Sequence, residues 1–357
     1  MKDKKQNIRN LSQAELIDEL AKVGEKKFRA KQVHEWLWKR GARSFDEMHN
    51  ISKKVTEHLS EHFFIDAIAI GDMQKSNDQT IKCAFDSYDK QVTEGVLIPT
   101  SSRVTACISS QVGCSLACKF CATGRLKLMR NLSPGEIYDQ VLLLNNLSDE
   151  HFKQRLSNIV FMGMGEPLLN YKNMIGGIEM ITSEAGLGIS PKRITVSTAG
   201  IAKMIKKLGD DKVKFNLALS LHAANDEKRS EIMDINDSNN LEALAEALQY
   251  FYEQTGSRIT FEYIIFKDFN DGLSDARELA EFCKHVPVKI NIIEYNPIDD
   301  GEFQQADPQK VDDFARYLEA CNLVVNVRRS RGKDIDAACG QLANKNKSIE
   351  LKERLLK

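Results

Sequence analysis

The feature that most limits the possible folds of this chain is a regular alternation of strands and helices from about residue 100 onward. The strand candidates read VTACIS, NIVFMGMG, RITVSTAG, KFNLALSLH, RITFEYIIF, KINIIEYNP and NLVVNVRRS. Segments with helical periodicity lie between them, and the first opens with a capping box at Ser133 and Glu136, with Pro134 at the first helical position. Repeated βα units predict a parallel sheet, and six or seven units instead of eight favour a partial barrel. We therefore expect an α/β fold with a partial (βα)6-type barrel.

The first part of the chain has a different pattern. Two helical segments, LSQAELIDELAKVG and KKFRAKQVHEWLWKRG, each stop at a glycine, and SKKVTEHLSEHF forms a third before three short strands. We expect three parts: a small, mostly helical accessory domain over residues 1–95, the barrel over 96–340, and a basic C-terminal tail over 341–357.

Charge and composition restrict the function classes only in part. The net charge is −1, but residues 1–60 carry 14 Lys or Arg against 9 Asp or Glu. A phosphate backbone requires such local positive patches more than a basic whole chain, so the accessory domain is the expected RNA contact, with solvated surface charge as the alternative. No apolar run is long enough to cross a bilayer, and the N-terminus lacks the apolar core of a signal peptide, so a cytoplasmic protein without a membrane partner is expected.

Unusual polar motifs follow successive predicted strands. They are Cys114 after VTACIS, Gly163–Glu166 after NIVFM, Ser197 and Thr198 in RITVST, Ser220 and His222 in LALSLH, and Asn296 in IEYN. Active sites of βα barrels are built at the carboxyl ends of the strands. Turn-forming residues would explain the glycines but not the Ser, His, Glu and Cys. The motifs therefore predict one shared active site.

Three of the eight cysteines, Cys114, Cys118 and Cys121, form a CxxxCxxC triplet in a predicted loop. Three thiolates with this spacing can hold three irons of a four-iron cluster and leave the fourth iron open for a substrate. Cys107 could complete a structural zinc site as a fourth thiolate. However, CxxxC lacks the usual two-residue clamp, and no paired CxxC or HxxxH follows downstream. We expect a [4Fe–4S] cluster with one open iron.

The stretch CISSQVGCSLACKFCATG resembles the radical S-adenosylmethionine superfamily, whose signature is CxxxCxxC with an aromatic residue, here Phe120, before the last cysteine. The resemblance implies that the open iron chelates S-adenosylmethionine and that one electron breaks the sulfonium bond to release a 5′-deoxyadenosyl radical. Reduction of a sulfonium requires the low end of the Fe–S potential range. The resemblance therefore also implies flavodoxin or ferredoxin as reductant.

The resemblance is closer still to one family and covers nearly the whole chain. TEGVLIP, CISSQVGC, FMGMGEPLLN, VSTAGI, LSLHA, EYNP and DIDAACGQL together are similar to RlmN, the dual-specificity enzymes that methylate C2 of adenine. Their substrates are 23S rRNA, at the peptidyl transferase centre, and tRNA, at the adenine 3′ of the anticodon. The resemblance implies S-adenosylmethionine contacts at Gly165, Glu166, Ser197, Ser220, Leu221, His222 and Asn296.

The family also implies roles for residues outside the cluster. Cys339 would take a methyl group from one S-adenosylmethionine, and the radical from a second molecule would activate that S-methyl group for addition to adenine C2. Cys107 would then attack the sulfur, release the methylated base and form a disulfide with Cys339. The two cysteines must therefore converge in the fold. Glu94 matches an acidic residue near the base, with a role in positioning or proton handling.

Three alternatives to adenine-C2 methylation remain open. The first is a Cfr-like enzyme, which shares both relay cysteines but methylates adenine C8 of 23S rRNA. The second is a non-enzymatic zinc protein that binds RNA, and the third is another radical enzyme acting on a small molecule. We expect the C2 methyltransferase, with rRNA and tRNA as partners and a monomeric state.

Overall fold

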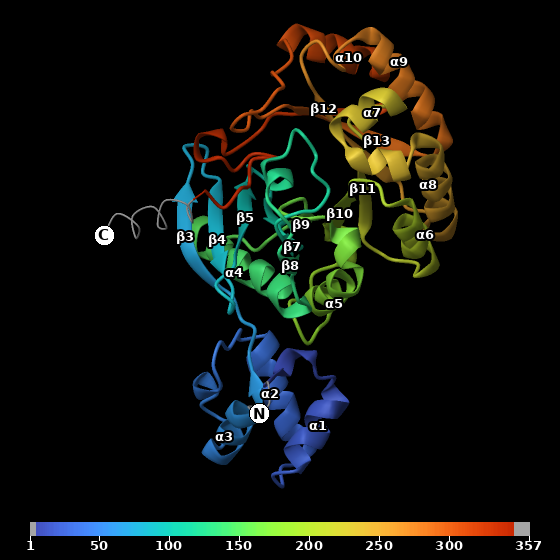
Figure 1. The fold of residues 1–357 in the computed structure, drawn as a ribbon. Coiled ribbons are helices and arrows are strands. Elements are labelled where there is room, and N and C mark those ends of the chain that lie inside the picture. Colours follow the sequence, from blue (N-terminus) through green and yellow to red (C-terminus); the bar gives the residue numbers. More distant parts are fainter. Residues whose placement is uncertain (1–4, 346–357) are drawn as a thin grey trace.

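The structure, a computed structural model, describes residues 5–345, so most of the expected tail, residues 346–357, lies outside the described residues. The chain begins with a helical lobe formed by α1 (Gln13–Ala21), α2 (Lys27–Trp38) and α3 (Lys53–His62). Short strands β1 (Gln6–Asn7) and β2 (Phe63–Phe64) pair in parallel and bring the two ends of the lobe together. Figure 1 shows this lobe below the main sheet. The expected three helices are confirmed.

A ten-stranded sheet, in the order β14-β13-β12-β11-β10-β9-β6-β5-β4-β3, forms the centre of the molecule. Seven of its strands run parallel, from β6 to β14. Their bounds are β6 (Val104–Ile108), β9 (Asn158–Phe161), β10 (Ile194–Thr198), β11 (Asn216–Ser220), β12 (Ile259–Ile265), β13 (Val288–Glu294) and β14 (Val324–Arg328). Within residues 5–345 the outermost strands, β14 and β3, do not pair with each other. The expected parallel, partial barrel is confirmed.

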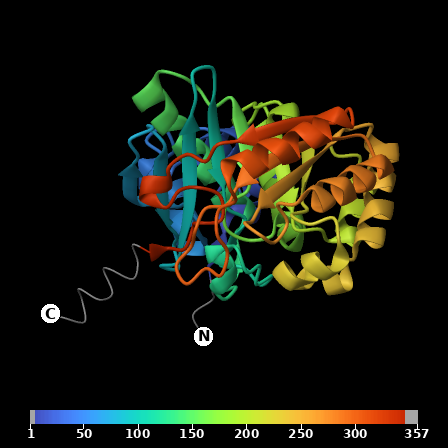
Figure 2. The ribbon, with the colours of Figure 1, turned by 90° about the horizontal axis from the view of Figure 1, so that it is seen from above.

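Helices connect the parallel strands in the expected βα order and cover the outside of the curved sheet (Figures 1 and 2). They are α4 (Pro134–Phe152), α5 (Tyr171–Thr182), α6 (Ala202–Asp210), α7 (Asp226–Ile232), α8 (Leu241–Thr255), α9 (Leu273–Phe282) and α10 (Pro308–Ala320). The capping box predicted at the start of α4 is present in both directions, between Ser133 and Glu136. Six crossovers between seven strands match the (βα)6-type expectation.

The alternation along β12 shows how the sheet separates core from site. Phe261 and Tyr263 pack in the main core with the helices. Ile264 belongs to a second apolar cluster, which also contains Phe120 of the cysteine loop. Because successive side chains of a strand point to opposite faces, Glu262 shares the inner face with Ile264.

Three antiparallel strands, β3 (Ala69–Lys75), β4 (Ile81–Asp86) and β5 (Val92–Pro99), extend the parallel sheet beyond β6. The division expected at residue 95 therefore falls within β5. We propose to assign the accessory unit to the helical lobe, up to about residue 65, and to treat β3–β5 as part of the catalytic sheet, since backbone pairing joins β5 to β6.

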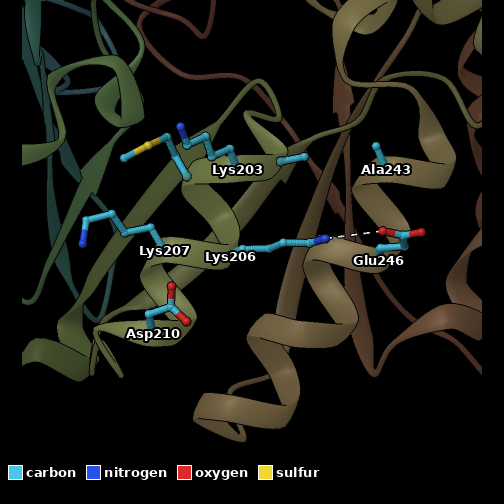
Figure 3. Close-up of a pocket in the computed structure, with 8 residues that line it drawn as sticks. Lys203, Lys206, Lys207, Asp210, Ala243 and Glu246 are labelled. Atoms are coloured by element: carbon cyan, nitrogen blue, oxygen red, sulfur yellow. Dashed lines mark hydrogen bonds and ion pairs between the residues drawn. The ribbon is translucent and has the colours of Figure 1, made fainter.

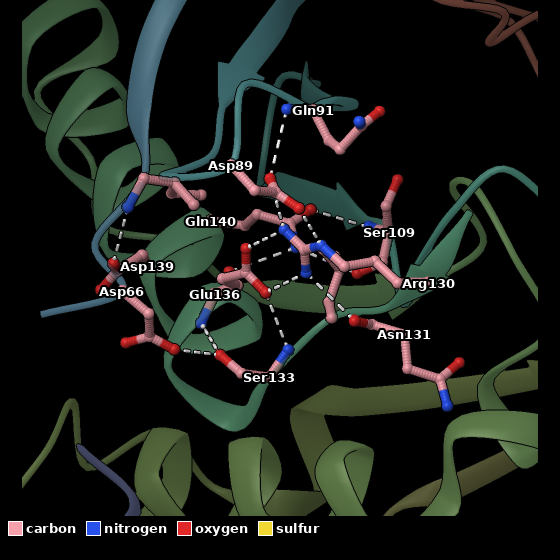
Figure 4. A network of polar contacts seen from close by, with 12 residues as sticks. Asp66, Asp89, Gln91, Ser109, Arg130, Asn131, Ser133, Glu136, Asp139 and Gln140 are labelled. Atoms are coloured by element: carbon pink, nitrogen blue, oxygen red, sulfur yellow. Dashed lines mark hydrogen bonds and ion pairs between the residues drawn. The ribbon is translucent and has the colours of Figure 1, made fainter. Parts of the chain in front are cut away.

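Buried and half-buried charges join the lobe to the barrel. Arg9, buried in the lobe, donates to Asp139 of α4 at 2.7 Å. Figure 4 shows a neighbouring network in which Arg130 contacts Asp89, in the β4–β5 turn, at 2.6 Å and Glu136 of α4 at 2.7 Å. Ser133 also donates to Asp66. Ion pairs and hydrogen bonds therefore fix the start of α4 against both the lobe and the β3–β5 extension.

Among the described residues, no helix is both long and apolar enough to span a bilayer.

Candidate active site

The cysteine triplet lies in the loop between β7 (Gln111–Val112) and the 3-10 turn Ala122–Arg125, directly after β6. Burial raises the pKa of the Cys118 thiol well above its ordinary value, and the nearby Cys121 and Cys114 raise it further. Backbone hydrogen bonds fix the loop at two points, from Lys119 to Ile232 at 3.1 Å and from Ala122 to Gly340 at 2.7 Å. The structure therefore gathers the three thiols in one desolvated loop.

The donor set fits an iron–sulfur cluster better than a single metal ion. Within residues 5–345 no three His, Cys, Asp or Glu side chains are arranged to hold one ion. A four-iron cluster does not require this, since each thiolate binds a different iron. Cys107, the candidate fourth zinc ligand, lies in β6 and packs with Met164 and Ala337 in a separate cluster. The zinc alternative therefore finds no support in the geometry.

Phe120, inside the triplet, ties the loop to the ends of the neighbouring strands. Its ring stands edge-on to His222, with 4.7 Å between centroids, and lies 5.6 Å from Phe266. The aromatic residue of the signature thus packs the cluster loop against the segments that follow β11 and β12.

Gly165 and Glu166 follow β9 and turn sharply toward the loop. Gly165 has φ +93°, and a Cβ there would lie 2.4 Å from the Gln111 side chain, so only glycine fits. The Glu166 carboxylate accepts from the backbone N–H groups of Leu168 at 3.0 Å and Ala199 at 2.8 Å. Burial raises the pKa of Glu166, and these hydrogen bonds oppose that rise. The Thr198 side chain also hydrogen-bonds to this carboxylate. A carboxylate has about four lone-pair directions, so these three hydrogen bonds leave room for one ammonium donor.

The residues expected at the carboxyl ends of β10 and β11 also meet. The hydroxyl oxygens of Ser197 and Ser220 are 3.2 Å apart. Leu221 is fully buried and donates its backbone N–H to the backbone carbonyl of Glu262 at 3.0 Å. His222 follows at φ +59°, and its Nδ1 accepts from the backbone N–H of Ile264 at 3.1 Å. Burial, with a smaller contribution from Arg229, lowers the pKa of His222 to about 3, so its ring is neutral at pH 7.

Arg229 in α7 is a site residue that the sequence did not reveal. It is completely buried and donates to the carbonyl oxygens of Ala199 at 2.6 Å and Leu221 at 3.1 Å, and to Asn236 Oδ1 at 2.7 Å. Burial lowers the pKa of Arg229 to about 10, and the nearby Cys118 opposes that change, so the guanidinium remains charged at pH 7. The Arg229 guanidinium therefore holds together the backbone after β10, at Ala199, and the backbone after β11, at Leu221.

Asn296 and Cys339 meet on the other side of the opening. The Asn296 side-chain N–H donates to the Cys339 carbonyl at 3.3 Å, while its buried Oδ1 has no partner among the described residues. A buried acceptor without a partner suits a ligand rich in N–H groups, such as S-adenosylmethionine.

The fold brings the surroundings of the two relay cysteines together, although they lie far apart in the sequence: Cys107 packs in one apolar cluster with Ala337, two residues before Cys339. Burial raises the pKa of Cys107 to about 12, and the proximity of Cys339 contributes to this rise. Cys339 is exposed to solvent, yet protein atoms surround it on enough sides that partial desolvation, with Cys121 and Glu262, raises its pKa to about 12. Both thiols are free, and the structure holds no disulfide between them.

Glu94, in β5, is almost fully buried at 1% exposure. Its Oε2 accepts from the backbone N–H groups of Ala343 at 2.9 Å and Asn344 at 3.0 Å. Glu94 therefore contacts the segment that follows Cys339.

Glu262 is a second residue that sequence reasoning missed, although a signal was available. It is the one acidic residue in the otherwise apolar or uncharged strand ITFEYII, and it faces the inner side of the sheet. Asn291 donates to its Oε1 at 2.7 Å, and Arg328 lies 3.8 Å from its Oε2. Burial raises the pKa of Glu262, while Arg328 lowers it.

A surface hollow between α6 and α8 contains none of these groups. Figure 3 shows it lined by the lysines of α6, with Lys206 and Glu246 paired at 3.4 Å across the two helices. It lies on the outer helical layer and not at the strand ends, so we assign it no part in the site.

Comparison with known proteins agrees with this geometry. Residues 6–65 match the ribosomal RNA large subunit methyltransferase N-terminal domain, and residues 108–283 match the radical SAM superfamily, whose members use a [4Fe–4S] cluster and S-adenosylmethionine. The chain is 57% identical over 345 residues to a probable dual-specificity RNA methyltransferase RlmN of Flavobacterium psychrophilum, covering 97% of this chain and 99% of that protein. It is 40% identical to the dual-specificity RNA methyltransferase RlmN of Campylobacter fetus, with 96% and 99% covered.

A solved structure agrees in fold over nearly the whole chain. The crystal structure of a radical SAM methyltransferase from Sphaerobacter thermophilus superposes with a TM-score of 0.89 at 35% identity, covering 94% of this chain and 99% of that one. The chain is therefore an enzyme of the RlmN family of dual-specificity RNA methyltransferases, within the radical SAM superfamily.

Proposed function

We propose that this RNA methyltransferase methylates C2 of adenine in 23S rRNA, at the peptidyl transferase centre, and in tRNA, 3′ of the anticodon. The observation that carries the proposal is that the backbone around Cys339 contacts both thiol sites. Ala337 packs in one apolar cluster with Cys107, and the Gly340 carbonyl accepts the N–H of Ala122, next to Cys121, at 2.7 Å. A thiol between the radical source and a second thiol suits a relay better than direct transfer to an electron-poor ring carbon.

The residues would divide the work as follows. Cys114, Cys118 and Cys121 would hold the cluster, and Glu166 with the residues at the carboxyl ends of β10 and β11 would hold S-adenosylmethionine. When bound, these groups would supply the methyl group and a hydrogen-abstracting radical. Cys339 would carry the methyl group to the base, and Cys107 would then attack the Cys339 sulfur to release the product.

Both thiols require activation before they react. Their pKa values of about 12 keep them protonated at neutral pH. A positively charged sulfonium beside Cys339 would favour its thiolate, because a nearby opposite charge stabilises the ionised form. Methyl acceptance would thus depend on the bound cofactor, which protects the free thiol from other electrophiles.

We propose that the helical lobe contacts the RNA. Phe28 is 54% exposed and lies 5.1 Å from the Arg29 guanidinium, while Arg40 lies 4.4 Å above the Trp36 ring. The exposed Phe28 ring and the exposed Arg40 guanidinium suit stacking on unpaired bases and contact with phosphates, while Arg29 and Trp36 are half-buried beside them. The base must leave its stack to reach the strand ends, so RNA loops are the fitting substrates.

The lobe's role can be tested with paired charge variants. The double variant Lys27→Gln with Lys31→Gln removes two exposed charges from α2 and should weaken RNA binding. The slope of log K against log salt concentration should become shallower by up to about 2. Lys203→Gln with Lys207→Gln, on α6, is the matched control and should leave both quantities unchanged. Equal affinity in the α2 variant and the wild type would contradict the proposal.

The relay is tested by separating its two cysteines. Cys339→Ala should abolish methylated adenosine, whereas Cys107→Ala should leave RNA covalently attached to the protein, detectable by mass spectrometry. Cys83→Ala, a fully buried position in β4, is the control and should keep activity. Full activity in Cys339→Ala would favour a radical enzyme of another kind.

We further propose that the enzyme is a monomer in the cytoplasm and that flavodoxin or ferredoxin reduces its cluster.

A further inference from the structure

The segment from Arg331 to Lys345, here called the Cys339 segment, has no strand partner in the sheet. Between Arg331 and Asn344 the structure assigns one regular element, a 3-10 turn at Lys333–Ile335, and the backbone is left-handed at Gly332, Asp336, Gly340 and Asn344. A segment without ladder hydrogen bonds depends on side chains for its position. The contacts that hold it therefore decide where the Cys339 sulfur lies.

One end of the Cys339 segment is fixed to the β3–β4 turn. Asp78 Oδ2 accepts from the Gly332 backbone N–H at 2.9 Å, and Arg331 donates to the Asp78 carbonyl. Asp334 in turn accepts from the Asn77 backbone N–H at 3.1 Å. Figures 1 and 2 show the red C-terminal segment beside the blue strands of this hairpin.

The other end is fixed to β5 by Glu94. Its Oε2 accepts both N–H groups of Ala343 and Asn344, at 2.9 and 3.0 Å, and the Asn344 side chain donates to the Val92 carbonyl at 2.8 Å. The remaining oxygen of Glu94, Oε1, lies 3.9 Å from the Lys82 ammonium group. Hydrogen bonds to charged acceptors are stronger than those between neutral groups.

Between these two anchors the segment meets the active site. Ala122 and Thr123, directly after the triplet, donate to the carbonyl oxygens of Gly340 at 2.7 Å and Leu342 at 2.6 Å. The Cys339 side chain remains exposed between the anchors. Loss of either anchor would release that end of the segment and leave the contacts with Ala122 and Thr123 to hold its middle, so the position of Cys339 relative to Cys107 would be less fixed.

We propose that Glu94 is a positioning residue, which together with Asp78 anchors the Cys339 segment to the β3–β5 extension so that the Cys339 sulfur faces Cys107. Glu94 takes no part in proton transfer, because one oxygen holds two backbone N–H groups and the other faces an ammonium group. The β3–β5 extension supplies both anchors, so these three strands help to position Cys339. This inference rests on the proposed relay through Cys339.

The test compares Glu94→Ala, Glu94→Gln and Asp78→Ala in the full-length protein with its cluster, under anaerobic conditions. Hydrogen exchange of residues 335–345 and alkylation of Cys339 by iodoacetamide report the anchoring. Both rates should rise at least about tenfold in the two alanine variants, the equivalent of one lost charged hydrogen bond. In Glu94→Gln both rates should rise less, since the amide oxygen of the glutamine can still accept both N–H groups. Asp89→Ala, at the β4–β5 turn, is the matched control and should leave both rates unchanged.

Formation of methylated adenosine then separates positioning from proton transfer. Anchoring predicts that Glu94→Gln keeps part of the activity and that Asp78→Ala loses activity alongside Glu94→Ala. Unchanged exchange and alkylation in Glu94→Ala, or inactive Glu94→Gln beside fully active Asp78→Ala, would overturn the inference. If Glu94→Ala does not fold, the Asp78→Ala variant decides the test. The Asp78 side chain is about one-third exposed, so its removal should disturb the fold less than removal of the buried Glu94. Full activity of Cys339→Ala would instead overturn the relay and leave the exchange result standing.

Discussion

Acidification should destabilise this enzyme through a single buried imidazole. His222 is 3% exposed, and its Nδ1 accepts a backbone N–H, so protonation would remove that hydrogen bond and place a cation near Arg229. Its pKa is about 3 in the folded chain and about 6.5 in an unfolded one. Between these values the unfolded state binds one more proton than the folded state. Stability is therefore complete above pH 6.5 and falls as the pH drops toward 3.

The size of the effect follows from the two pKa values. Proton uptake by the unfolded chain at His222 is worth about 0.2 kcal/mol at pH 7 and about 2 kcal/mol at pH 5. His222 should thus remove about 2 kcal/mol from the free energy of unfolding over this interval. His222→Asn should lack this part of the pH dependence, because Asn tolerates the left-handed backbone at φ +59° and its oxygen can accept the same N–H.

Urea unfolding of the cluster-free protein at pH 7 and pH 5, followed by circular dichroism, measures the difference. The other histidines and carboxylates titrate in both proteins, so their contributions cancel in the comparison. A wild-type loss equal to that of His222→Asn, within about 0.5 kcal/mol, would refute the assignment of this buried neutral ring.

Three further results are expected from substitutions in the site. Gly165→Ala should destabilise the fold far more than Gly24→Ala, because both have positive φ but only Gly165 meets a side chain, at 2.4 Å; equal unfolding midpoints would contradict this. Glu166→Gln should lose about 1.5–3 kcal/mol of unfolding free energy, since one of its two backbone N–H partners at 3.0 and 2.8 Å faces an amide donor, and an unchanged urea midpoint would argue against it. Cys118→Ala should lose most of the about four irons per chain while Cys83→Ala keeps them; iron analysis showing equal contents would count against the cluster assignment.

The partial barrel could be predicted from the sequence because the signals for its strands and helices are local. The capping box at Ser133 and the alternation of strands and helices identify elements from neighbouring residues alone, and the βα order then fixes the parallel sheet. The pairing of β5 with β6 could not be inferred in this way, since it joins an antiparallel hairpin to a parallel sheet through tertiary contact. The expected boundary at residue 95 fell inside β5 for that reason.

The site shows the same division between local and tertiary signals. The motifs at strand ends predicted that Ser197 and Ser220 lie together, and they do, because the carboxyl ends of parallel strands share one edge of the sheet. Arg229 looks like a surface residue of a short charged helix, and only the fold reveals the carbonyl groups around it. Glu262 was detectable as an isolated charge in a buried strand. The partners of Glu94 lie in a segment without regular structure, which no periodicity marks.

The product on the RNA tests the central claim most directly. The wild-type enzyme, with its cluster intact and reduced, should convert adenosine in 23S rRNA and in tRNA to 2-methyladenosine, detected by mass spectrometry of nucleosides after complete digestion. Detection of 8-methyladenosine alone, or of no methylated adenosine, would contradict the assignment of this site to adenine C2.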